Sequence, residues 1–318
     1  MNAPLTNAKH QVGKKLMAGV GNKSLLSTKQ IAPFHGLTLI FLFGLILLTL
    51  FFREQIPLWQ SLVLRYVSSV GLLFVIKLIY DRNMMGKAGI FLHHFSPIFF
   101  VIFIYTSLGD LIQHLQPDID PLLIRIDYLL FGVHPTVWIE RWIVPWLTDL
   151  MSVAYGSYYF LPVILIMTLY LKGREQELKL SLFVLVLGYY ISFIGYILFP
   201  AIGPRYTLTH LQTIPLEGSF LTDWVRDGLN ALEHNKRDAM PSGHTQIALI
   251  VLYLAYRYER LIFYLFLPII SGLILSTVYL RYHYVVDLFA GGGLAVGCMV
   301  FGPPLFELWN RFCNRRQL

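Results

Sequence analysis

The sequence predicts an all-α polytopic membrane protein with about eight transmembrane helices. Hydrophobic residues make up 56% of its 318 residues and charged residues only 14%, whereas soluble domains carry about 25% charged residues. The mean hydropathy is +0.60. Most of its apolar segments approach the roughly 20 residues that span a hydrocarbon core. They lie at about 36 to 52, 58 to 80, 94 to 108, 151 to 171, 180 to 199, 244 to 257, 261 to 280 and 284 to 306.

Charge patterning divides and orients the chain. Lysine and arginine residues gather in the N-terminal tail, in alternate connections and near the C-terminus. The net charge of +7 therefore indicates the cytoplasmic side of a bilayer, by the positive-inside rule, rather than nucleic-acid binding. We expect four regions: a cytoplasmic tail at 1–35, two additional helices at 36–93, a six-helix bundle at 94–306 and a cytoplasmic tail at 307–318.

One stretch, from Lys236 to Asp287, carries the residues best suited to chemistry. It begins with KRDAMPSGHT, ends with YLRYHYVVD, and contains about two apolar segments between them. Because that length makes one out-and-back passage through a bilayer, His244 and His283 are predicted to meet at the same membrane face, the face opposite the termini.

These residue types fit phosphoryl transfer. Histidine can act as a nucleophile or as a proton donor near neutral pH. Asp287 follows His283 by four residues, so on a helix its carboxylate can orient the imidazole. Ser242 and Gly243 stand where a helix should begin, so backbone N–H groups would point at a bound phosphate. Four basic residues could supply positive charge to that phosphate: Lys236, Arg237, Arg281 and Arg205.

The motifs resemble the type 2 phosphatidic acid phosphatase (PAP2) superfamily, membrane enzymes that act on lipid phosphates through a phosphohistidine. The resemblance rests on PSGH at 241–244 and on His-x-x-x-Asp at 283–287, and it covers roughly residues 94 to 306. It implies a six-helix PAP2-like catalytic bundle in which His283 is the nucleophile, Asp287 orients it and His244 is the general acid. It also implies that no metal or other cofactor takes part.

The chain departs from the family pattern at two places. Where the third family motif usually has arginine, six residues before the nucleophile, this chain has Thr277. The first motif, Lys-x6-Arg-Pro, is absent, and GPRY at 203–206 is its best replacement. YLRYHYVVDLFAG and IDYLLFGVHP resemble the branch of inositol phosphorylceramide synthases and their bacterial relatives.

The sequence leaves several functions open. We expect a lipid phosphatase; the alternative is a phosphotransferase that moves a phospho-headgroup from a phospholipid to a lipid alcohol. Two rivals are a metal-dependent hydrolase with His244, His283 and Asp287 as ligands, and a lipid transporter, which inverted repeats or broken helices would favour. Neither feature is evident in the sequence. The expected partners are a membrane lipid and the bilayer, the expected location is a bacterial inner membrane, and the oligomeric state stays open.

Charged and polar residues elsewhere have simpler interpretations. Arg65 lies within the second apolar segment and is predicted to pair with a neighbouring helix. The remaining histidines that we considered have no partner at a telling spacing and are predicted to be structural: His93, His94, His114, His134, His210 and His234.

Overall fold

A computed structural model describes residues 30–232 and 235–315, so most of the predicted tail at 1–35 lies outside the described residues. Within the described ranges every regular element is a helix, which confirms the predicted all-α class. The elements of the first half are α2 Pro33–Phe51, α3 Trp59–Asp81, α4 Gly86–Ile112, α5 Asp120–Phe131, α6 Pro135–Trp138, η1 Ile139–Trp142, α7 Pro145–Gly156 and η2 Ser157–Tyr159. The second half contains α8 Leu161–Leu171, α9 Glu175–Leu198, α10 Pro204–Thr207, α11 Thr222–Leu232, α12 Gly243–Tyr258, α13 Arg260–Tyr279 and α14 Val285–Arg315.

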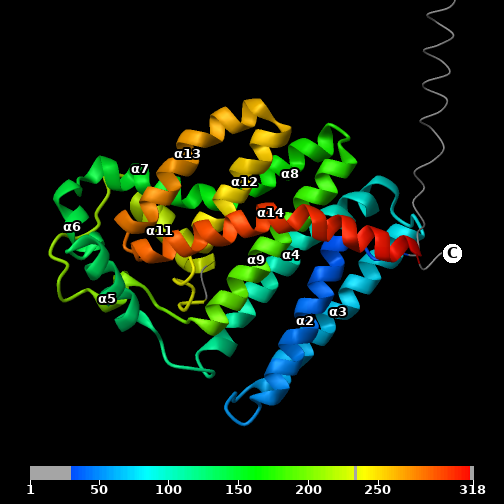
Figure 1. Ribbon diagram of the computed structural model, residues 1–318, viewed down its shortest axis with the longest axis horizontal. Coiled ribbons are helices and arrows are strands. Elements are labelled where there is room, and N and C mark those ends of the chain that lie inside the picture. Colours follow the sequence, from blue (N-terminus) through cyan, green and yellow to red (C-terminus); the bar gives the residue numbers. More distant parts are fainter. Residues whose placement is uncertain (1–29, 233–234, 316–318) are drawn as a thin grey trace, which may run out of the picture.

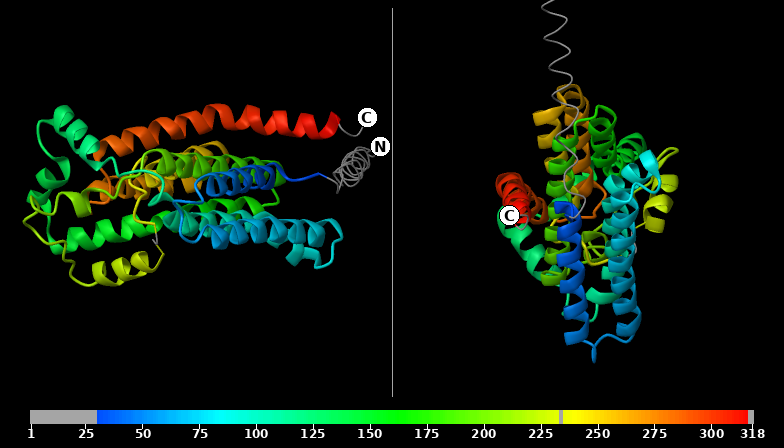
Figure 2. Two further views of the ribbon diagram at one scale, coloured as in Figure 1. Left: turned by 90° about the horizontal axis from the view of Figure 1, so that it is seen from below. Right: turned by 90° about the vertical axis from the view of Figure 1, so that its right-hand side faces the viewer.

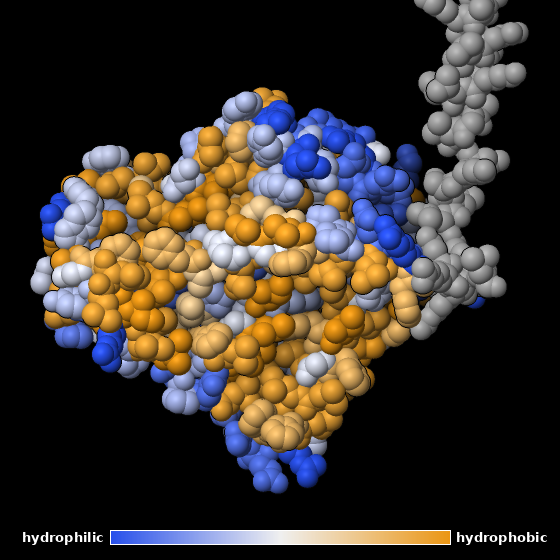
Figure 3. Space-filling model, viewed as in Figure 1, coloured by the Kyte–Doolittle hydropathy of each residue, from blue (hydrophilic) through white to orange (hydrophobic). Residues whose placement is uncertain are grey.

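Length and composition make this a polytopic membrane protein. Six described helices are long and apolar enough to cross a membrane, and the number rises to eight if each of two bent helix pairs counts as one span. The six are α2, α3, α4, α9, α13 and α14. Figure 3 shows the matching surface, on which apolar residues cover most of the visible face and hydrophilic residues gather at its margins.

The two bent pairs correct the expectation that the chain has no broken helix. One pair, Asp120–Phe131 with Pro135–Trp142, is bent by 64°, and the other, Pro145–Tyr159 with Leu161–Leu171, by 45°. The second helix of each pair has proline in its first turn. Proline is compatible with a helix start but lacks the N–H that would continue a preceding helix. The predicted segment at 151–171 therefore runs across the bend of the second pair, and the segment at 244–257 is α12, too short to count among the six.

Helix α9 forms the centre of the bundle (Figure 1), and it is the most buried of the six candidate spans. It packs against α2, α4, α8, α12 and α14. Gly188 lets α12 approach closely, because a Cβ atom there would lie 2.7 Å from the Cδ1 atom of Ile250. Since α2 contributes Phe34 and Leu42 to the same buried apolar cluster as α9, the two additional helices belong to the common core.

The arrangement puts one group of connections at one end of the bundle. The start of α2 and the end of α14 lie together at one end (Figure 2), and α5, α6 and α11 lie at the other (Figure 1). Helices α12 and α14 both begin near the second end and run back along the bundle. This places the two predicted motifs side by side. Ser242 N–H donates a hydrogen bond to the backbone carbonyl of Asp287 at 3.1 Å.

Candidate functional site

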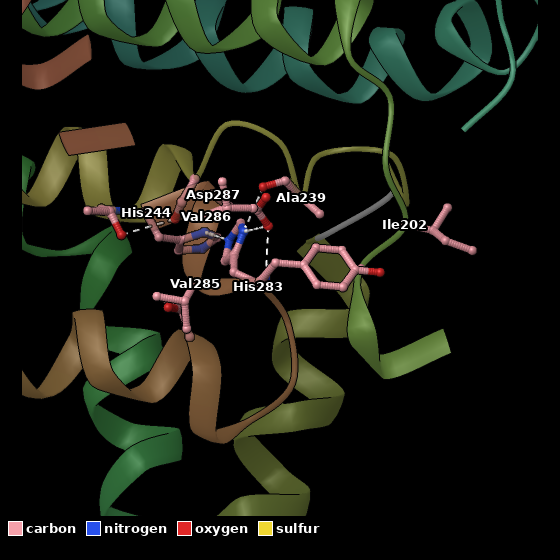
Figure 4. A network of polar contacts seen from close by, with 12 residues as sticks. Ile202, Ala239, His244, His283, Val285, Val286 and Asp287 are labelled. Carbon is pink, nitrogen blue, oxygen red and sulfur yellow. Dashed lines mark hydrogen bonds and ion pairs between the residues drawn. The ribbon is translucent and has the colours of Figure 1, made fainter. Parts of the chain in front are cut away.

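Two buried histidines meet where α12 and α14 begin (Figure 4). His244 lies in the first turn of α12, and His283 lies in the short loop between α13 and α14. His283 Nε2 is 3.3 Å from His244 Nδ1. The side chains are 2% and 8% exposed, respectively, and His244 Nε2 has no hydrogen-bond partner among the described residues. The pair therefore combines contact between the rings with one unused buried nitrogen.

The neighbours of His283 determine which nitrogen is free to react. Its Nδ1 lies 2.8 Å from the carbonyl oxygen of Ala239 and 3.6 Å from Oδ2 of Asp287. A carbonyl oxygen can only accept, so Nδ1 carries the proton and the lone pair of the neutral ring lies on Nε2. That lone pair faces His244. Burial lowers the pKa of His283, but the hydrogen bond and charge of Asp287, the charge of Asp238 and the Ala239 carbonyl outweigh it, so the pKa is raised overall.

Two carboxylates of α5 hold the start of α14, and the sequence interpretation missed their role. Asp127 accepts hydrogen bonds from the backbone N–H groups of Val285 and Val286, at 2.9 Å each. Asp120 accepts from the N–H groups of Ile202 and Gly203 and from the hydroxyl of Tyr284. Both carboxylates are 2% exposed. Asp127 therefore acts as a helix cap supplied from another helix, and its negative charge suits the N-terminus of α14.

The loop that carries His283 begins with a Schellman motif at the end of α13. Tyr282 N–H donates to the Thr277 carbonyl at 2.9 Å, and Arg281 N–H donates to the Val278 carbonyl at 3.0 Å. Arg281 has a φ of +65°, a left-handed conformation that usually belongs to glycine and costs a side-chain-bearing residue about 1–2 kcal/mol. The Thr277 carbonyl also accepts from His283 N–H at 3.0 Å, so the motif fixes the backbone of His283.

Comparison with known proteins identifies the family of this chain. The family model described as PAP2 superfamily matches residues 122–301, more than half of the chain. The chain belongs to the PAP2 superfamily. It is also 25% identical over 177 residues to a PA-phosphatase related-family protein of Dictyostelium discoideum. That match covers 49% of this chain and 32% of the relative, so the chain spans only about a third of the relative's length. No solved structure matches the chain.

The turn before α12 shows why PSGH fits this PAP2 fold. Ser242 caps the helix, because its hydroxyl accepts a hydrogen bond from Thr245 N–H at 3.3 Å. A Cβ atom on Gly243 would lie 2.2 Å from the hydroxyl oxygen of Tyr196, and one on Gly195 would lie 2.3 Å from Cδ of Pro241. The turn therefore packs directly on α9. The first N–H groups of α12 lie beside the histidine pair and could receive an anion.

Arg205 lies close to the histidine loop. Gly203, with a φ of +87°, brings the GPRY turn against this loop, because a Cβ atom there would meet the Tyr282 carbonyl at 2.5 Å. Arg205 Nη1 donates to the Tyr282 hydroxyl at 3.2 Å, and its guanidinium lies 5.2 Å from the centre of the Tyr282 ring. The turn thus brings a cation next to the residue that precedes His283.

The other predicted phosphate-binding residues have protein partners or face outward. Arg281 Nη2 is 2.6 Å from both Glu140 Oε1 and the Ile214 carbonyl, and its buried Nε has no partner among the described residues. Arg237 Nε donates to Asp118 at 2.7 Å, and Lys236 is exposed. The structure therefore brings Arg205 and the start of α12 toward the histidine loop and holds Arg281 and Arg237 in ion pairs.

A polar cavity of about 490 Å³ lies beside the histidine loop. Its lining includes Arg205, Arg226, Arg281 and Tyr282. Asp149 fixes one wall, because it accepts hydrogen bonds from the backbone N–H groups of 219–222 at the start of α11. The connection between α10 and α11 therefore forms an ordered wall of this cavity.

Proposed function

We propose that this protein is a lipid phosphatase that works through a phosphohistidine at His283. One observation carries the proposal: His283 presents its Nε2 lone pair to His244, while its other nitrogen donates to the Ala239 carbonyl beside Asp287. Membership of the PAP2 superfamily supports a phosphoric ester hydrolase of this kind.

In the first step His283 Nε2 attacks phosphorus and forms the P–N bond. The bond from phosphorus to the leaving alcohol oxygen breaks, and protonated His244 gives its proton to that oxygen. Asp287 stabilises the positive charge that develops on His283 and keeps the ring in position. In the second step His244 takes a proton from water as the water oxygen attacks phosphorus, and the P–N bond breaks.

The phosphoryl oxygens would be held by Arg205 and by backbone N–H groups in the first turn of α12, where Ser242 caps the helix. Arg281, Arg237 and Lys236 add positive charge around the site. Because Arg281 and Arg237 are already paired with carboxylates, Arg205 is the arginine with the greatest expected effect on phosphate binding.

Phosphotransfer to a lipid alcohol is a second candidate. The observation that favours it is an apolar cavity with His244 in its wall, because a lipid alcohol could reach the phosphohistidine there in place of water. Addition of a lipid alcohol would then divert phosphate from release to a new ester, whereas a strict phosphatase would release phosphate whatever alcohol is added.

The covalent step can be tested by labelling. We expect His244→Ala to accumulate a phosphorylated enzyme when the donor has a leaving group that needs no protonation, because breakdown still requires His244 as the base. The label should be acid-labile, base-stable and located on His283, and His244→Ala/His283→Ala should carry none. Absence of label alongside an active wild type would contradict the covalent mechanism.

We also propose that the protein resides in a bacterial inner membrane, with cytoplasmic termini and the site on the extracytoplasmic face. The starts of α12 and α14, which carry the histidine pair, lie toward the end of the bundle opposite the described chain ends (Figure 1), and this supports the orientation. In intact cells a membrane-impermeant thiol reagent should label a cysteine introduced at Thr213 and should not label one at Gly173. The reverse labelling would contradict the orientation.

A further inference from the structure

A narrow apolar cavity leads through the bundle to the histidine pair. It measures about 130 Å³ and lies between α4, α8 and α9. Along α9 it extends from Leu182 to Tyr196, which at 1.5 Å per residue is roughly 20 Å. Ile102, which lines it, is 53% exposed, so the cavity reaches the outer surface of the bundle. Such walls suit a hydrocarbon chain that enters from the bilayer.

The end of this cavity at His244 is polar. Asp238 and Tyr105 line it there, and the Tyr105 hydroxyl donates a hydrogen bond to Asp238 Oδ2 at 2.6 Å. Asp238 immediately precedes Ala239, whose carbonyl accepts from His283, so its carboxylate is attached to the backbone that positions the nucleophile. Burial raises the pKa of Asp238, and the Tyr105 hydrogen bond and His283 only partly oppose that rise.

A carboxylate at this position disfavours a phosphoryl group and favours an alcohol hydroxyl. An ionised Asp238 would repel the phosphoryl oxygens, which carry negative charge. The same carboxylate can accept a hydrogen bond from an alcohol hydroxyl, and its protonated form can donate one to an alcohol oxygen. The function proposed above uses Asp287, His244 and His283 and gives Asp238 no role.

We propose that Asp238 and Tyr105 bind the hydroxyl oxygen of a membrane lipid alcohol whose hydrocarbon chain occupies the apolar cavity. This inference rests on the proposed function, because it makes Asp238 a specificity-determining residue of the same site. The alcohol has two possible sources. It is the leaving alcohol of the lipid phosphate, or it is an acceptor that attacks the phosphohistidine.

The test uses the full-length protein purified in detergent and two donors: dioctanoyl phosphatidate, which has a lipid alcohol, and p-nitrophenyl phosphate, which has none. If Asp238 binds the leaving alcohol, we expect Asp238→Asn to lower the ratio of kcat/KM for the lipid to kcat/KM for the aryl phosphate about tenfold, the usual value of a hydrogen bond to a charged group. Tyr105→Phe should lower the ratio in the same direction. Asp110→Asn removes another carboxylate, one that pairs with Arg65 at the surface, and should leave the ratio as in the wild type.

The two sources give different intermediates. If Asp238 binds the leaving alcohol, Asp238→Asn slows formation of the phosphoenzyme from dioctanoyl phosphatidate. If it binds an acceptor, the loss falls instead on transfer of the phosphoryl group to added dioctanoylglycerol. Hydrolysis that falls equally on both donors, or on neither, together with unchanged transfer to added dioctanoylglycerol would overturn the proposal.

A binding measurement separates this inference from the proposed function. Radiolabelled dioctanoylglycerol should bind to His283→Ala, and the additional change Asp238→Asn should weaken that binding about tenfold. Binding that depends on Asp238, combined with a wild type that turns over no phosphate ester, would reject the proposed function and keep the inference. Binding that is indifferent to Asp238 would reject the inference even if the enzyme is active.

Discussion

Two clusters of buried histidines occupy opposite parts of this bundle and differ in what surrounds them. His244 and His283 lie where α12 and α14 begin, next to two carboxylates, the buried Asp287 and the half-buried Asp238. The second cluster lies among α2, α3 and α4, where His35 and His93 have ring centres 4.7 Å apart and His93 stacks on Tyr80 at 3.9 Å.

The second cluster has no acidic hydrogen-bond partner among the described residues. His35 Nε2 is 2.8 Å from the Ser96 hydroxyl, and His94 Nδ1 is 2.9 Å from the carbonyl of Ile90. Two further nitrogens, His93 Nδ1 and His94 Nε2, are buried without partners among the described residues. These rings therefore contribute packing and local hydrogen bonds.

The difference in carboxylate partners shows that burial alone does not make a histidine suited to catalysis. Asp287 can stabilise an imidazolium ion at His283, whereas the rings of the second cluster would have to carry such a charge inside an aromatic shell. The position of each cluster follows from this. The first lies where two helices begin beside loops that bring carboxylate partners. The second lies between packed helices, with His35 in the first turn of α2 and His93 and His94 within α4.

Removing one ring from the first cluster is the most direct test of its role in chemistry. We expect His283→Ala and His244→Ala each to lower kcat/KM for a lipid phosphate by at least about 10²–10⁴-fold, the range for an acid–base group. Both proteins should stay folded and membrane-inserted, as judged by size-exclusion elution in detergent. Wild-type rates in either variant would remove the basis for the proposed roles.

The carboxylate scaffold should give the next largest effect. Asp127→Asn replaces one acceptor oxygen of the cap on α14 with an amide that also donates, so one of the N–H groups of Val285 and Val286 loses its partner at about 1–3 kcal/mol. We expect a fall in kcat of about tenfold or more with a smaller change in KM, because Asp287 and His283 shift together. Glu307→Gln, on the exposed far part of α14, is the matched control and should behave as wild type.

Hydropathy was enough to predict the fold class and most spans, because a bilayer forces backbone groups to bond within helices and leaves a long apolar signal. Hydropathy could not predict that 151–171 belongs to a bent pair, or that α12 is short. Both features depend on how the neighbouring helices pack. The pairing of Arg65 with Asp110 at 2.9 Å confirms the predicted ion pair with another helix.

The histidine pair was predictable because both motifs are local and one hairpin joins them. The caps were not, because Asp127 reaches residues 285 and 286 from more than 150 positions away. One signal was available: Asp120 and Asp127 are seven residues apart and share one face of α5. The ion pair of Arg281 with Glu140 could not be predicted either, because the two residues are 141 positions apart in the sequence.

The dependence of kcat/KM on pH tests whether Asp287 acts on His283. Because Asp287 raises the pKa of His283, its removal lowers that pKa, and the neutral nucleophile then persists to lower pH. The acidic limb of kcat/KM against pH should therefore move to lower pH in Asp287→Asn, while the maximum rate falls. Glu307→Gln should leave the limb in place. An upward move in Asp287→Asn would show that Asp287 acts on another group.

Removing a ring from the second cluster should have a different effect. His93→Ala removes the ring that stacks on Tyr80 and opens a cavity, which for an aromatic ring costs about 3–5 kcal/mol. We expect a clearly lower unfolding temperature and, below that temperature, kcat/KM within about threefold of wild type. His93→Phe keeps the stacking area and serves as the matched variant, with much of the stability restored. A loss of activity in both variants at unchanged stability would mean that the second cluster takes part in the chemistry.

Metal removal should have the smallest effect on activity. A phosphohistidine mechanism forms and breaks its bonds with His283, His244 and solvent, so we expect full activity after dialysis against EDTA and in its continued presence. The rival is a hydrolase in which His244, His283 and Asp287 bind a divalent cation, and it requires activity to fall on chelation and return with added metal. Asp287→Asn separates the two further, because a lost metal ligand would make activity depend on the concentration of added Zn²⁺ or Mn²⁺. A lost positioning carboxylate would leave the remaining activity indifferent to both ions.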